Sequence, residues 1–111
     1  MITEDYVSYE TAKLLKEKGF DEECQQYYGD YKYLCPTLQM AMKWLREVHH
    51  YYIQVMLDCW ALGDHLGYYV VIQKTDSDFE MMLSNALDEV FYKTPEEACE
   101  AGIKYCLENL I

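Results

Sequence analysis

Side chains that could bind a metal or transfer a proton gather between residues 47 and 65. They are His49, His50, Cys59 and His65, of the types that bind zinc or exchange protons near neutral pH. A zinc site needs spacings such as C-x2–4-C or H-x3–5-H, which bring two donors to one point. The sequence has neither, and adjacent helical residues such as His49 and His50 point about 100° apart. The spacing therefore predicts no metal, no cofactor and no catalytic residue; a small metal-binding, ligand-binding or catalytic domain stays the alternative.

The spacing of the apolar residues predicts the helix and strands that position these side chains. Thr37 is a natural N-cap, and a helical apolar stripe follows it, which predicts a core helix ending at the two histidines. Residues 51–57 then alternate as a half-buried strand does, 68–74 read as a second strand, and the connection between them can close an antiparallel hairpin. The members of the helical stripe are Leu38, Ala41, Met42, Leu45 and Val48, widened by Met40 and Trp44.

Capping patterns mark two further helices. Ser8 and Gly19 bound a helix over 9–18, and Thr94 with Pro95 opens a C-terminal helix whose small residues let it approach a sheet closely.

The stretch from 76 to 89 is ambiguous. Ser77 and Glu80 form a capping box that predicts a short helix over 78–87, and the alternative is a strand over 79–83. Residues 89–93 have the length and composition of a third strand.

The order of elements is helix, helix, strand, strand, an ambiguous piece, strand, helix. This order predicts the α+β class, with a small antiparallel three-stranded meander and helices packed on one face. The 111 residues fit one domain, 1–111, because no linker or internal repeat divides them.

A tyrosine-rich connection separates the first two helices. It reads as an irregular or short-strand segment whose rings either pack over the core or form a contact surface of rigid amphipathic groups. Asp64, in the hairpin connection, is added to the contact surface as a further acidic group. The predicted partner-binding residues are Tyr27, Tyr28, Tyr31, Tyr33, Asp30 and Asp64.

The charge limits the classes of partner. Twenty acidic against nine basic residues give a net charge of −11, which repels nucleic acid and anionic membrane and steers the protein toward basic surfaces. The alternative is that the acids only keep the protein soluble. Five cysteines, an odd number, and no signal-peptide pattern predict free thiols and a cytoplasmic protein, and no apolar run reaches the length of a membrane span.

Four stretches of the chain stand out together: VSYETAKLLKEKGFDEEC, PTLQMAMKWLREVHHYYIQV, GYYVVIQK and TPEEACEAGIKYCLENLI. With these stretches the chain resembles a family of small uncharacterised proteins encoded by gut bacteria of the Bacteroides type and by their phages and prophages. The resemblance implies a phage-associated cytosolic context. It carries over no functional residue.

The leading hypothesis is a small acidic interaction protein without enzymatic activity that binds a partner with a basic surface. In a phage setting this becomes an inhibitor, or a decoy that imitates the charge of a short duplex. Direct binding of nucleic acid or membrane is not expected, and a homodimer through exposed tyrosines and apolar residues is a further alternative.

Overall fold

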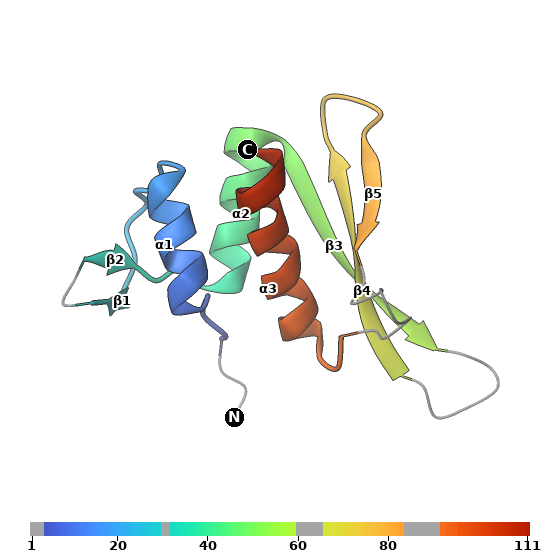
Figure 1. Ribbon diagram of the computed structural model, residues 1–111, viewed down its shortest axis with the longest axis horizontal. Coiled ribbons are helices and arrows are strands. Elements are labelled where there is room, and N and C mark those ends of the chain that lie inside the picture. Colours follow the sequence, from blue (N-terminus) through green and yellow to red (C-terminus); the bar gives the residue numbers. More distant parts are fainter. Residues whose placement is uncertain (1–3, 30–31, 60–65, 84–91) are drawn as a thin grey trace.

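The computed structural model describes residues 4–29, 32–59, 66–83 and 92–111. Three helices lie on one side of a three-stranded sheet, and a two-stranded hairpin packs beyond the first helix (Figure 1). The elements are α1 (Tyr9–Glu17), β1 (Tyr27–Tyr28), β2 (Tyr33–Leu34), α2 (Leu38–His49), β3 (Tyr51–Cys59), β4 (Leu66–Lys74), β5 (Glu80–Leu83), α3 (Pro95–Tyr105) and the π-helical turn η2 (Cys106–Leu110).

The sheet is antiparallel with the order β3-β4-β5. β3 and β4 pair over nine residues, from Tyr51 opposite Lys74 to Cys59 opposite Leu66. The α+β class and the antiparallel meander with helices on one face are therefore confirmed. Both predicted strands are longer than the alternating pattern indicated, because the ladder continues beyond residue 57 and before residue 68.

The third strand is not where the sequence predicted it. β5 lies at Glu80–Leu83, so the predicted helix over 78–87 is wrong where the structure describes it, and the alternative strand is correct. The Ser77 hydroxyl accepts from the Phe79 N–H and starts no helix, while the Lys74 N–H donates to the Phe79 carbonyl and closes a hairpin.

Of the predicted strand over 89–93, only residues 92 and 93 are described. Tyr92 forms an isolated antiparallel bridge with Tyr68, in which the two residues exchange both backbone hydrogen bonds at 2.8 and 2.9 Å. Tyr92 therefore pairs with β4 on the side where β5 pairs with it.

The predicted caps are confirmed at all three helices. The hydroxyls of Ser8, Thr37 and Thr94 each accept a backbone N–H from the first turn of their helix. After α1, Gly19 takes a positive φ of 94°, and the Phe20 N–H returns to the Leu15 carbonyl at 2.9 Å. These local signals fix where each helix begins or ends.

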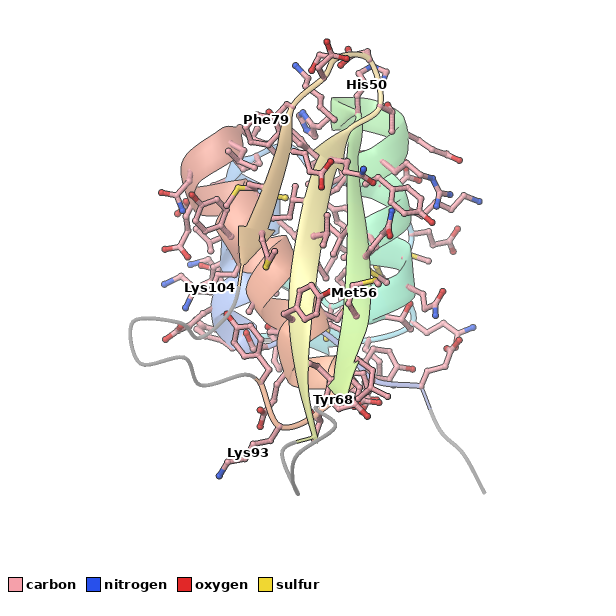
Figure 2. All side chains as sticks on the ribbon, turned by 90° about the vertical axis from the view of Figure 1, so that its right-hand side faces the viewer. His50, Met56, Tyr68, Phe79, Lys93 and Lys104 are labelled. Atoms are coloured by element: carbon pink, nitrogen blue, oxygen red, sulfur yellow. The ribbon has the colours of Figure 1, made fainter. Side chains whose placement is uncertain are left out.

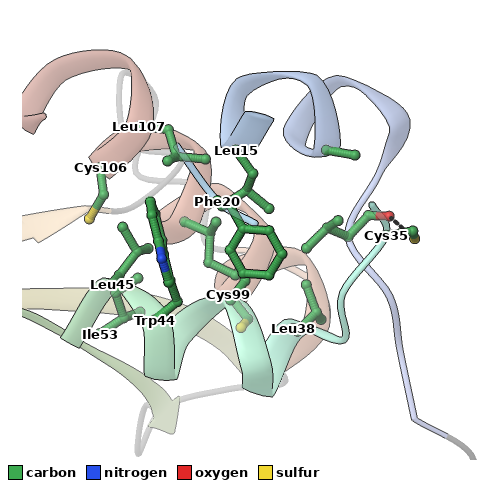
Figure 3. Close-up of a cluster of buried hydrophobic side chains, with 14 of the residues drawn as sticks. Leu15, Phe20, Cys35, Leu38, Trp44, Leu45, Ile53, Cys99, Cys106 and Leu107 are labelled. Carbon is green, nitrogen blue, oxygen red and sulfur yellow. Dashed lines mark hydrogen bonds between the residues drawn. The ribbon is translucent and has the colours of Figure 1, made fainter. Parts of the chain in front are cut away.

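The core lies among the three helices and between α2, α3 and the sheet (Figure 3). Leu45 of α2 and Ile103 of α3 are fully buried, and Phe20 meets Trp44 edge to face at 5.4 Å between ring centroids. The prediction fails at Val48, which is 52% exposed although it continues the apolar stripe of α2.

Candidate functional site

The candidate metal ligands lie at opposite ends of β3. His49 is the last residue of α2, and His50 follows it in a left-handed conformation with φ of 66°. Cys59 is the last residue of β3, so roughly 30 Å of extended chain separates it from the histidines. One ion cannot bind both ends. No group of three metal-binding residues occurs within the described ranges, and His65 lies outside them.

The His49 side chain packs against a neighbouring aromatic ring. Its imidazole lies 4.7 Å from the Trp44 ring in an edge-to-face contact, and its Nε2 is buried without a hydrogen-bond partner. Burial lowers the pKa of His49, with a smaller contribution from His50 nearby. The folded protein therefore favours the neutral imidazole.

We expect His49 to make folding stability depend on pH. Because its pKa is lower in the folded than in the unfolded state, its contribution is present above the unfolded pKa of about 6.5 and is lost as pH falls through the folded pKa. His49→Gln should flatten the dependence of the unfolding free energy on pH just below that value, measured by urea titration. His50→Asn, which tolerates the left-handed backbone, is the control and should change the pH dependence much less, because His50 is only the smaller cause of the lowered pKa of His49; equal flattening by both variants would contradict the assignment.

The described cysteines are packing groups. Cys24, Cys35, Cys99 and Cys106 are free and buried. Burial raises the pKa of both Cys99 and Cys106 to about 12, so neither is a thiolate at neutral pH. These four are free thiols, as the sequence predicted, and they pack as small hydrophobic residues.

The tyrosines of the β1–β2 hairpin pack against the first helix. The Tyr28 hydroxyl donates to the Val7 carbonyl at 2.9 Å, and the Tyr9 ring meets the rings of Tyr28 and Tyr33 edge to face. Tyr27 is 40% exposed. Both Tyr28 and Tyr33 are partly buried against the core, which supports the packing interpretation for these two.

The charged side chains that lie over the rings of Tyr9 and Tyr33 are lysines. Lys16 and Lys32 lie over the Tyr33 ring, at 5.2 and 5.3 Å from its centroid, and Lys13 lies over Tyr9. The positive charge of these lysines does not favour a basic partner at the hairpin. The predicted residues Asp30, Tyr31 and Asp64 lie outside the described residues.

A groove between α2 and β3 is the feature best suited to a partner. Figure 2 shows α2 behind the sheet and beside β3, on the side away from β4. Two adjoining hollows of about 380 and 500 Å³ lie along this line and share Gln39, Met42 and Ile53. Val55 and Cys99 extend the apolar lining of the larger hollow.

Opposite charges line the two parts of this α2–β3 groove. Glu4, Asp5 and Glu96 line the larger hollow, near the start of α2. Lys43 and Arg46 line the smaller one, near the start of β3, where Arg46 also lies 5.9 Å from the centroid of the Tyr52 ring. The three acids are exposed, so they act on whatever enters the groove.

The backbone hydrogen bonds of the sheet show which N–H and C=O groups face each of its edges. Lys74 donates to Phe79 on the β5 side, and Tyr68 exchanges hydrogen bonds with Tyr92 on that same side. Because hydrogen-bonding direction alternates along a strand, the even-numbered residues of β4 face β5 and the odd-numbered ones face β3.

It follows that alternate residues of β3 direct their backbone away from the sheet. Val71 of β4 faces β3 and is paired with Gln54, so the backbone of Gln54 faces β4. The N–H and C=O groups of Ile53, Val55 and Leu57 therefore face the open side, beside α2. Within the described part of the chain no strand pairs with β3 there.

The face of the sheet opposite the helices carries exposed methionines. Met56 is 38% exposed and Met82 is 67% exposed, and both lie on this face (Figure 2). On the same face the Gln54 amide donates to the Gln73 amide oxygen across the strands at 2.7 Å. No hollow among those described is lined mainly from this face.

Fold and groove together define an acidic α+β protein in which no described strand pairs with the sheet edge beside α2. Comparison of the chain with models of protein families, with curated proteins and with solved structures found no match. Among the described residues, no helix has the length and apolar character required to cross a membrane.

Proposed function

We propose that this protein is a non-enzymatic interaction protein that binds a basic protein partner in the α2–β3 groove. The observation that carries the proposal is the pairing, in one groove, of an apolar floor with an acidic lining. Met42, Ile53 and Val55 supply apolar surface, and Glu4, Asp5 and Glu96 supply the charge. Interfaces of this kind combine an apolar centre with a polar rim.

The charge of the whole protein supports the same kind of partner. A net charge of −11 creates a field that accelerates the approach of a cationic surface and repels an anionic one. Of the nine basic residues, Lys16 and Lys32 lie over Tyr33 of the hairpin, Lys13 lies over Tyr9 of α1, and two line the smaller hollow of the groove. The acidic residues that line the larger hollow therefore act within the negative field of the whole protein.

The separation of the candidate catalytic groups favours binding over catalysis. A general base or a metal works only beside the groups it activates, and His49 and Cys59 lie at opposite ends of a nine-residue strand. The thiols of Cys24, Cys35, Cys99 and Cys106 are buried and have raised pKa values, so none of these four is a thiolate nucleophile at neutral pH.

Replacing the acidic residues of the α2–β3 groove by lysine should weaken the binding of a basic partner. We expect the combined change of Glu4, Asp5 and Glu96 to lysine to reduce the affinity for lysine-containing peptides at least about tenfold, since each exposed charge pair contributes on the order of 0.5 kcal/mol. The measurement is fluorescence anisotropy at about 0.05 M and about 0.5 M NaCl, and the wild-type affinity should fall with salt.

A matched variant separates the groove from the general field. Replacing Glu17, Glu22 and Glu108 by lysine changes the net charge equally but touches exposed acidic residues that line no described hollow. This variant should lose clearly less affinity. An equal loss in both variants would assign binding to overall charge and overturn the groove as the site.

Two narrower hypotheses, a phage-associated inhibitor and a decoy that imitates nucleic acid, stay predictions. A phage-associated inhibitor that acts as a decoy must compete with nucleic acid for the same partner, although it does not itself bind nucleic acid. Duplex DNA should therefore displace the protein from a captured partner, and failure of DNA to compete would leave the binding function without the decoy role.

A further inference from the structure

We propose that the partner contributes an extended segment that pairs its backbone with β3 and becomes a fourth strand of the sheet. This inference rests on the proposed function and specifies how the groove is used. It needs an edge with unpaired backbone groups, room beside that edge, and an occupant whose chemistry matches the lining.

The edge of β3 meets the first requirement. The backbone groups of Ile53, Val55 and Leu57 face outward, and no described strand pairs with them. Proteins usually protect such edges with prolines, lysines or inward charges. Residues 51–57 contain none of these, and Asp58 is the one charged residue of β3, so over 51–57 neither the sequence nor a described strand blocks pairing.

The groove gives the room. The hollows of about 380 and 500 Å³ follow β3 on its unpaired side, with α2 as the opposite wall. In an added strand alternate side chains point to opposite faces of the sheet. One set would therefore enter the groove against Met42 and Val55, and the other would extend the outer face beside Met56. Backbone pairing then gives affinity, and the alternate pockets give specificity.

The position of α2 selects the kind of occupant. A second copy of this chain would bring its own α2 on the same face as its β3, so two helices would compete for the space over one edge. Both copies would also carry a net charge of −11. The groove suits a strand-forming segment of a different protein, without a helix packed on that side.

The charges of the lining set the composition of this segment. Its end beside Glu4, Asp5 and Glu96 takes lysine or arginine, and its middle takes apolar residues at alternate positions. The end beside Lys43 and Arg46 takes neutral or acidic residues. A segment with lysines at the opposite end, read in the same direction, places like charges together.

Two modifications of the backbone test the strand directly. The probes are peptides of about nine residues in which valine alternates with threonine and lysines stand at one end, at the other end, or nowhere. The tightest peptide is resynthesised with N-methyl groups at either of the two alternating sets of amides. We expect one N-methylated set to reduce affinity about tenfold or more and the other to have little effect, because only alternate N–H groups face β3.

Leu57→Pro makes the same test from the protein side. It removes an outward-facing N–H, a change that an edge strand tolerates, while Leu57→Ala removes only the exposed side chain. The proline variant should bind about tenfold more weakly than the alanine variant, with both melting near the wild-type temperature. If the proline variant unfolds, the N-methylated peptides still decide the question.

The outcomes separate this inference from the proposed function. Binding that depends on the acids of the groove but not on either backbone modification would overturn strand addition and leave the basic partner in place. If no lysine-containing peptide binds, or if binding ignores the acids of the groove, both proposals fail. Equal losses from the two N-methylated sets would also overturn the alternating geometry.

Discussion

Leu45→Ala is expected to destabilise the protein by about 3 kcal/mol, while Val48→Ala, one turn further along the same helix, should cost less than about 0.5 kcal/mol. Both residues belong to the apolar stripe that the sequence predicts for α2. In the structure Leu45 is fully buried and Val48 is 52% exposed. A cavity can form only at the first position. Urea unfolding of both variants measures the difference.

The comparison tests how α2 is rotated against the core. Equal costs at the two positions would mean that the whole stripe is buried, and the wall of the α2–β3 groove would then differ from the one described. A helix rotated so that Val48 faced inward would reverse the order of the two effects.

Gly102→Val should destabilise the protein by about 2–3 kcal/mol by overpacking. A Cβ atom at this position would lie 2.9 Å from a methyl group of Val70 and 3.1 Å from one of Ile53, both of which are buried in the sheet. The helix has to move away from the sheet or the strands have to shift. The free energy of unfolding in urea reports the cost.

Ala101→Val is the control for the β-branched side chain itself. Residue 101 is only partly buried, so this change should cost about 0.5 kcal/mol from helix propensity. A Gly102→Val variant as stable as Ala101→Val would contradict the close approach of α3 to β3 and β4.

The helices could be predicted because their signals are local. A hydroxyl at the N-cap acts on an N–H two or three residues later, and Gly19 acts within one turn, so neither depends on the rest of the fold. The alternation of β3 and β4 was equally readable. The small residues of α3 correctly indicated close contact with a sheet, which Gly102 provides.

The third strand could not be placed from the sequence. Ser77 and Glu80 carry a capping pattern, but the open edge of β4 offers Val70 and Ile72 as partners for residues 81–83, and that pairing prevails over local propensity. The exposure of Val48 likewise depends on which neighbours cover the end of α2, and the helical period does not contain that information.

The candidate site shows the same limit more strongly. Residue type drew attention to His49, His50 and Cys59, and the length of β3 holds the two histidines apart from the cysteine. The groove joins acids from the N-terminal segment and from α3, Glu4 and Glu96, which only the tertiary fold brings together. That no strand of the described residues pairs with the outer edge of β3 follows only from the strand order. A long alternating strand without lysine or proline was the one signal in the sequence that could have suggested it.

The most direct test follows the amide resonances of the ¹⁵N-labelled protein while the lysine-containing alternating peptide is added. We expect the largest shifts at Ile53, Val55 and Leu57 and along the facing side of α2, with the amides of these three β3 residues becoming protected from exchange. Shifts centred on the β1–β2 hairpin, with the edge of β3 unchanged, would contradict the assignment of the partner to the groove.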